Sequence, residues 1–162
     1  MQTFLTSINF RYAAKDLDNK RLNKQILEVY QILNVLSGQS MGWRNHPAVL
    51  MWKDAEMHLW DYIQQMIIEA KKRGIKTDKN ESNLNTLRYS FGQDWGKDVP
   101  EFLKDGPVSK RLTATHKANL FNKDPLQYIR FQHYALHSPY NEPCCDTCKY
   151  YWPTHIDRVK TS

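Results

Sequence analysis

No run of about 18 apolar residues occurs in this sequence of 162 residues, so we expect no membrane-spanning helix. Its first residues, Met1-Gln2-Thr3-Phe4, lack a charged start followed by an apolar run, so we expect no signal peptide. Both absences predict a cytoplasmic protein with reduced thiols. The P-loop, G-x-G-x-x-G, G-x-S-x-G and H-E-x-x-H motifs are missing too, which argues against several common classes of enzyme.

Cysteine is scarce and gathered near the end of the chain, at Cys144, Cys145 and Cys148. Cys145 and Cys148 form one C-x-x-C pair, with three histidines nearby in the sequence, His133, His137 and His155. Zinc takes four nitrogen or sulfur ligands, and a second C-x-x-C pair is missing. Two interpretations stay open: a structural zinc site, or reduced thiols without a metal. We expect no metal in the chemistry.

The charge is basic but only moderately so. Lysine and arginine number 23 against 17 acidic residues, which gives a net charge of +6 and a pI near 9.2. A basic surface suits partners that carry phosphate, but many basic proteins bind nothing anionic. Charge therefore permits nucleic-acid binding without establishing it.

Apolar residues recur every three or four positions in three segments, which predicts helices over 16–36, 47–73 and 108–121. Asp16 or Asp18 can cap the first of these helices, and Gly38 can end it. The second helix has Pro47 in its first turn with Asn45 as its cap, and ends at Gly74.

The remaining segments predict little regular structure. Residues 76–95 are polar and Asn-rich, which favours a loop with at most a short helix. A short helix is predicted over 98–104 and a short turn over 124–131, and the proline-containing tail, about 138–162, should be irregular. No segment shows convincing strand alternation. We therefore predict an all-α fold, a compact single domain over 1–162 with about three longer helices, short helices and long loops.

One face of the first predicted helix is polar and carries a single carboxylate. The face consists of Arg21, Lys24, Gln25, Glu28 and Gln31. Glu28 is the one acidic residue between Lys20 and Lys53. One interpretation is a solvated face with an ordinary Lys24–Glu28 pair. The other is a carboxylate that stabilises a cationic intermediate.

Two further polar clusters could contact phosphate. Arg44, Asn45 and His46 precede a predicted helix start, where free N–H groups favour anions. The alternative is a loop that buries Trp43 and caps the helix through Asn45. His116 and Lys117, near Lys110 and Arg111, form a second basic surface, or else an ordinary solvated face.

Several motifs together resemble a known family. They are residues 17–25 with Glu28, the loop 42–49, the start Met1-Gln2-Thr3-Phe4-Leu5, the run Lys123-Asp124-Pro125 followed by Tyr128, and Trp152-Pro153. This pattern resembles the pyrimidine dimer DNA glycosylases, the phage endonuclease V type, and more closely a bacterial and viral branch of that family. The resemblance implies an all-α fold and a DNA glycosylase with coupled AP-lyase activity on damaged or modified bases. A backbone α-amine attacks C1′, an imine forms, and β-elimination cuts the strand.

The resemblance assigns roles to particular residues. Glu28 matches the essential glutamate, and Met1 supplies the amine, because Gln2 is bulky and the initiator methionine should stay. An α-amine suits this role, since such groups titrate at about 7.7–8.0 and lysine at about 10.4. The expected DNA-binding residues are Arg21, Lys24, Arg44, Asn45, His46, His116 and Lys117. Trp43 or Trp52 could fill the space left by a flipped nucleotide.

The expected partner is double-stranded DNA, bound by a monomer without a cofactor and away from membranes. The resemblance also implies a bacterial or viral source. Two alternatives stay open: a DNA-binding domain that has lost catalysis, and a small zinc-stabilised interaction module in which Glu28 is a surface acid.

Overall fold

The computed structural model describes residues 1–136 and 151–154 of the chain. Within these residues the regular secondary structure consists of α-helices and short 3₁₀ helices without β-strands, so the predicted all-α class is confirmed. None of the described helices is both long and apolar enough to cross a bilayer. The predicted irregular tail, 138–162, lies outside the described residues except for 151–154.

The chain divides into two compact units, which we describe separately. The first comprises Met1–Thr3 and Asn9–Pro100, and the second comprises Phe4–Ile8 and the chain from Glu101 onward. A single domain over 1–162 stays a prediction.

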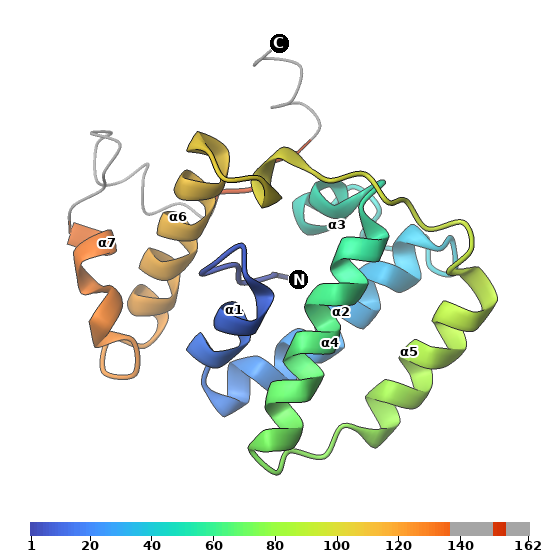
Figure 1. Ribbon diagram of the computed structural model, residues 1–162, viewed down its shortest axis with the longest axis horizontal. Helices are drawn as coiled ribbons and strands as arrows, with labels where there is room; N and C mark the ends of the chain where they lie inside the picture. Colours follow the sequence, from blue (N-terminus) through green and yellow to red (C-terminus); the bar gives the residue numbers. More distant parts are fainter. Residues whose placement is uncertain (137–150, 155–162) are drawn as a thin grey trace. The chain divides into compact units, whose positions relative to one another are not determined.

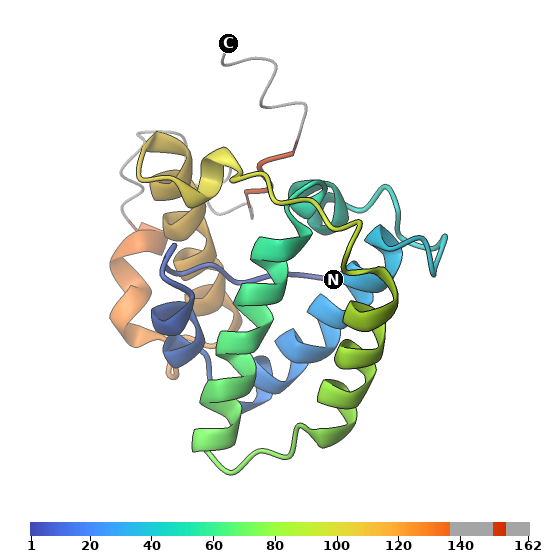
Figure 2. The same cartoon turned by 45° about the vertical axis from the view of Figure 1, so that its right-hand side comes forward.

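The first unit is a helical assembly built around α2. Its helices are α1 (Phe10–Asp16), α2 (Asn19–Leu36), α3 (Pro47–Trp52), α4 (Glu56–Lys72) and α5 (Asp78–Phe91). Helix α4 packs against α1 and α2, and α5 packs against the other side of α2 (Figures 1 and 2). The apolar stripe predicted on α2 lies in the core, where Leu22, Ile26 and Leu33 have no exposed surface.

Helix α2 begins and ends close to where its sequence predicts. The Asp18 side chain is the N-cap and accepts a hydrogen bond from the Arg21 backbone N–H at 3.0 Å. At the other end Gly38 adopts φ +74°, a left-handed conformation that glycine accommodates without a Cβ clash. Both signals are local, which is why sequence alone locates them.

The single helix predicted over 47–73 is wrong, because the chain breaks between Trp52 and Glu56. Asp54 takes φ +65°, which no α-helix contains. The Glu56 carboxylate stabilises the break by accepting hydrogen bonds from the backbone N–H groups of Asp54 (3.2 Å) and Gly96 (2.8 Å). The helical spacing of apolar residues continues through the break (Trp52, Ala55 and Leu59 are all buried), so periodicity could not reveal it.

The loop predicted over 76–95 is also wrong, because most of it forms α5. Leu84 and Leu87 are its two buried residues, too few for a recognisable apolar stripe. Charge near its start supports the helix instead: Glu81 pairs with Lys71 at 2.8 Å, and Thr77 donates a hydrogen bond to the Glu81 carboxylate. Tertiary contacts of this kind override weak local patterns.

Helix α1, which the sequence pattern did not predict, is stabilised by hydrogen bonds from a side chain at the end of α4. The Arg73 guanidinium donates hydrogen bonds to the carbonyl oxygens of Leu17 (2.6 Å), Lys15 (3.2 Å) and Ala14 (3.4 Å). These carbonyls lie at the end of α1 and just beyond it, where a helix leaves its acceptors unpaired. A short helix is marginal by itself, so it depends on such contacts.

The second unit contains η1 (Glu101–Leu103), α6 (Pro107–Lys123), η2 (Ile129–Phe131) and α7 (Gln132–Leu136). Helix α6 confirms the helix predicted over 108–121. Its His116 side chain is fully buried: Nδ1 accepts the Leu5 N–H at 2.8 Å, and Nε2 lies 3.2 Å from the Tyr151 carbonyl oxygen. The ring is therefore the neutral tautomer that donates from Nε2, and burial lowers the pKa of His116 to about 3.

Burial of a neutral His116 predicts acid sensitivity. Below pH 6.5 the imidazole gains a proton in the unfolded chain but not in the folded one. The free energy of unfolding therefore decreases as the pH decreases. The slope from this group approaches about 1.4 kcal/mol per pH unit between roughly pH 6 and 5. Urea unfolding across this range measures the slope, and NMR of the folded protein should find the ring neutral at about pH 5. A His116 ring that titrates near 6.5 in the folded protein would contradict this prediction.

Candidate active site

The first residues of the chain lie against α2, within the first unit (Figure 1). The Gln2 backbone N–H donates to Glu28 Oε2 at 3.2 Å, and the Gln25 side-chain amide donates to the Gln2 carbonyl oxygen at 2.8 Å. Both peptide groups of Gln2 are therefore held by side chains of one helix. Neighbouring backbone nitrogens are joined by three bonds and lie at most about 3.7 Å apart, so the α-amine of Met1 lies within about 7 Å of the Glu28 carboxylate.

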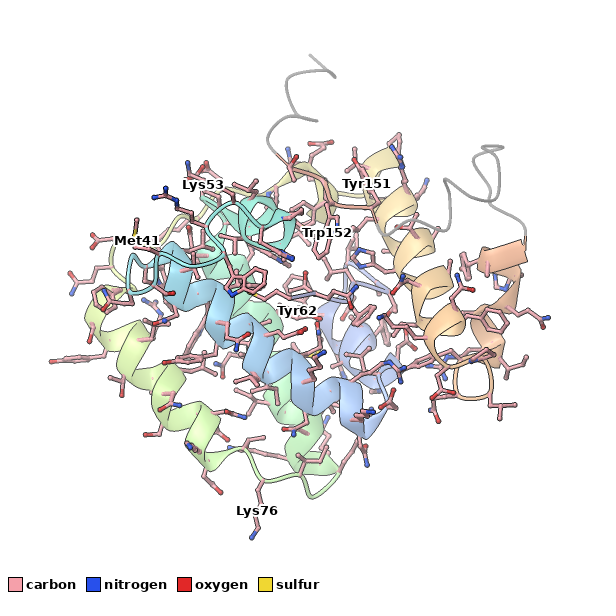
Figure 3. All side chains as sticks on the ribbon, turned by 180° about the vertical axis from the view of Figure 1, so that it is seen from behind. Met41, Lys53, Tyr62, Lys76, Tyr151 and Trp152 are labelled. Atoms are coloured by element: carbon pink, nitrogen blue, oxygen red, sulfur yellow. The ribbon has the colours of Figure 1, made fainter. Side chains whose placement is uncertain are left out.

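Gln25 is oriented by a second, deeper contact. The Tyr62 hydroxyl of α4 donates to Gln25 Oε1 at 2.8 Å, and Gln25 Nε2 also lies 3.2 Å from Glu28 Oε2. Gln25 and Tyr62 are almost completely buried, and Figure 3 shows Tyr62 beside α2. Because the oxygen faces a hydroxyl donor and the nitrogen faces two acceptors, the orientation of the carboxamide is determined.

The next residue of the chain, Thr3, is also held in place by a side chain of the first unit. Its hydroxyl oxygen accepts a hydrogen bond from the Trp52 indole N–H at 3.0 Å, and both side chains are fully buried. The Trp52 ring in turn packs against Tyr62, with ring centroids 6.0 Å apart. We call Gln25, Glu28, Trp52 and Tyr62 together the N-terminal clamp.

The two oxygens of Glu28 have different surroundings. Oε2 accepts hydrogen bonds from two neutral N–H groups, those of the Gln2 backbone and the Gln25 side chain, whereas Oε1 lies 3.6 Å from the Lys24 ammonium group. Glu28 is only 8% exposed, while the Lys24 side chain is 67% exposed. The carboxylate therefore lies at the edge of the core, with one oxygen fixed by the protein and the other beside a solvated cation. A fully solvated helix face does not describe it.

His46 lies near both charges of this site. Burial lowers its pKa, the positive N-terminus lowers it further, and Glu28 acts in the opposite direction. His46 Nδ1 accepts the Ala48 backbone N–H at 3.1 Å and so caps α3. The prediction that Asn45 is the cap is therefore wrong by one residue. A neutral His46 carries its proton on Nε2 and is a hydrogen-bond donor there.

The other predicted DNA-binding residues differ in their surroundings. Arg44 and Asn45 are exposed on the loop before α3, and Arg21 forms an ion pair with Asp18. In the second unit, Lys117 Nζ lies 3.2 Å from the Tyr134 hydroxyl and 5.8 Å from the centre of the Phe131 ring. His116 is the exception, because a buried neutral ring with both nitrogens hydrogen-bonded offers nothing to a phosphate. We therefore exclude His116 from the candidate interface.

Sequence reasoning did not identify Thr3 or Tyr62 as parts of the site, and it considered Trp52 only for filling the space left by a flipped nucleotide. Gln25 was recognised only as a member of the polar face of α2, although its i,i+3 spacing to Glu28 puts the two side by side. Within residues 1–136 and 151–154, no group of three His, Cys, Asp or Glu side chains could hold a metal ion. The candidate zinc ligands Cys145 and Cys148 lie outside the described residues.

Comparison with known proteins identifies the family. No curated protein and no solved structure matches the chain. The family model described as pyrimidine dimer DNA glycosylase matches residues 1–83, a segment that contains Met1 and the complete N-terminal clamp. Because this match spans just over half of the 162 residues, the chain belongs to the pyrimidine dimer DNA glycosylase family.

Proposed function

We propose that this protein excises damaged pyrimidines from double-stranded DNA and cuts the strand at the resulting abasic site, with the α-amine of Met1 as nucleophile. It works as a monomer and needs no cofactor in this scheme. The observation that carries the proposal is the hydrogen bond between the Gln2 N–H and Glu28 Oε2, 3.2 Å long, which brings the start of the chain beside the one carboxylate of α2.

The proposed reaction has three steps. The amine lone pair attacks C1′ of the damaged nucleotide, and the C1′–N bond breaks with its electron pair leaving on the base, which takes up a proton. The sugar ring opens as the C1′–O4′ bond breaks and leaves its electron pair on O4′, which takes up a proton, while the nitrogen loses a proton and forms the imine. Removal of a C2′ proton then expels the 3′ phosphate, and water hydrolyses the imine to free the enzyme.

Glu28 would act electrostatically and as a proton carrier. Positive charge develops on C1′ and O4′ during attack and then on the imine nitrogen, and a fixed carboxylate stabilises both. Because Oε2 accepts hydrogen bonds from the Gln2 backbone and the Gln25 side chain, we assign the proton transfers to Oε1.

The basic residues around the clamp would hold the DNA backbone. Lys24 and Arg44 are exposed cations, and Arg21 lies one turn before Lys24 on α2. Neutral His46 would act as a hydrogen-bond donor to a phosphate oxygen rather than as a cation. Asn45 completes the proposed set of the first unit, and Lys117 is proposed as a separate DNA contact of the second unit.

Glu28→Gln tests the carboxylate. Its amide oxygen can still accept the hydrogen bonds from Gln2 and Gln25, so the N-terminal clamp should persist while the negative charge is lost. We expect single-turnover excision of a pyrimidine dimer to slow by about 10²–10³-fold. The dissociation constant for dimer-containing duplex should change by less than about threefold, since no phosphate contact is removed.

Lys24→Gln is the matched control for Glu28→Gln, because it removes the partner charge and leaves the carboxylate. It should weaken DNA binding and make that binding less dependent on salt. Excision at wild-type speed by Glu28→Gln would refute the role assigned to the carboxylate.

Reaction of the N-terminus tests the nucleophile. Borohydride should reduce the imine and join the protein to abasic DNA through Met1, and acetylation of the α-amine should abolish this cross-link. Peptide mass spectrometry identifies the joined residue. Cross-linking that survives acetylation would assign the reaction to a lysine, and DNA binding without any cross-link would indicate a binding domain that has lost catalysis.

Gln2→Ala tests which backbone nitrogen, that of residue 1 or that of residue 2, must carry the free amine. With a small second residue the initiator methionine is removed, and the free amine moves to the nitrogen that now lies 3.2 Å from Glu28. If Met1 is the nucleophile, this shift should slow cross-linking. Faster cross-linking would instead assign the reacting nitrogen to position 2.

Gln25→Leu tests whether the N-terminal clamp positions the amine. The leucine nearly preserves volume but releases the Gln2 carbonyl, so we expect borohydride cross-linking to slow by about 10–100-fold with DNA affinity unchanged. Tyr62→Phe, which removes only the hydroxyl that orients Gln25, should have a smaller effect. If in both variants the loss of cross-linking simply followed the loss of thermal stability, the network would only support the fold.

A further inference from the structure

The loop between α2 and α3 exposes two large apolar side chains. Met41 and Trp43 are each 67% exposed, and Figure 3 shows Met41 on this loop. Exposed apolar groups are common singly, but two such groups separated by one glycine, followed directly by an exposed arginine, form a distinct surface. We call residues 41–44 the Trp43 loop.

The Trp43 loop has a defined conformation. Trp43 takes φ +64°, a left-handed value that a bulky L-residue rarely adopts. Its carbonyl oxygen accepts the His46 N–H at 2.8 Å, and its ring meets the His46 imidazole edge-on with centroids 5.7 Å apart. An unfavourable backbone angle kept together with an exposed indole points to a function for this presentation rather than to packing.

The Trp43 loop also lies next to the candidate active site. His46, which supports the indole, is close enough to the N-terminus and to Glu28 for both charges to act on it. Arg44 follows Trp43 directly and can reach a phosphate, so the loop pairs an aromatic face with a cation. Single-stranded and distorted DNA is bound by this combination, because bases stack on aromatic rings while cations follow the backbone.

We propose that Trp43 inserts into the base stack of the DNA duplex and occupies the space left when a nucleotide at the lesion turns out of the helix. The inference rests on the proposed function, because C1′ of a stacked nucleotide is inaccessible to the amine and must be exposed first. Met41 extends the apolar wedge, and Arg44 holds the phosphate beside the gap. Apolar side chains inserted between base pairs are an established means of keeping DNA kinked.

The structure separates Trp43 from the other tryptophan considered for this role. Trp52 has no exposed surface and donates its indole N–H to Thr3, so it belongs to the N-terminal clamp. Replacing Trp52 would disturb the position of the amine itself, whereas Trp43 can be replaced without touching the clamp.

The test compares one lesion in two DNA contexts. An abasic site in duplex DNA requires the wedge, whereas the same site in a single strand is already unstacked. Trp43→Ala should slow strand cleavage of the duplex by about tenfold and leave cleavage of the single strand within about twofold of wild type. Trp43→Phe, which keeps an aromatic face, should recover most of the duplex rate. Tyr89→Ala removes an aromatic side chain of α5 that is 89% exposed, and should change neither rate.

A fluorescence measurement separates insertion from chemistry. With 2-aminopurine opposite the abasic site, wild-type protein should raise the emission as the stack opens, and Trp43→Ala should raise it far less. Equal losses on both DNA substrates, or no loss on the duplex, would overturn the insertion. If the wild type cleaves neither substrate, the proposed function fails, and the 2-aminopurine signal alone then decides whether Trp43 inserts.

Discussion

The hydrogen bond from the Gln25 carboxamide to the Gln2 carbonyl oxygen, 2.8 Å long, is the contact on which the candidate site depends. The start of a chain is ordinarily among its least ordered parts, since it has few contacts to offset the entropy of being fixed. Here a buried amide supplies a directional partner to the main chain of residue 2, and Thr3 follows into the core. An N-terminal amine is thereby confined near Glu28, as the proposed reaction requires.

The same network explains how a carboxylate can lie at the edge of a core. A buried polar group is costly when it lacks partners, and each group in this network has one. Tyr62 satisfies the Gln25 oxygen, the Gln25 nitrogen satisfies Gln2 and Glu28, and the Gln2 N–H adds a second donor to Glu28. One oxygen of Glu28 thus keeps the side chain in place while the other lies beside Lys24.

Local sequence signals identified the elements that local physics determines. Asp18, Gly38 and the apolar stripe of α2 act over a few residues, so they can be recognised without knowledge of the fold. The break at Asp54 depends on a contact with Gly96, which is far away in the sequence, and α5 depends on an ion pair with Lys71 of the preceding helix. Periodicity contains no information about such partners, which is why both predictions failed.

The candidate site, like the fold, could be predicted from the sequence only in part. Helical spacing puts Gln25 and Glu28 on one face of α2, whereas the expectation that the first residues lie beside Glu28 came from the family resemblance and not from the spacing. The prediction that His116 contacts DNA was based on its chemical type alone. A histidine among basic residues is a plausible phosphate ligand until its burial is known. At Trp43 the sequence left two interpretations open, a buried loop residue or a residue that meets DNA, and the side chain is exposed at a left-handed backbone angle. In both cases solvent exposure, a property of the fold, determines whether a side chain can meet DNA.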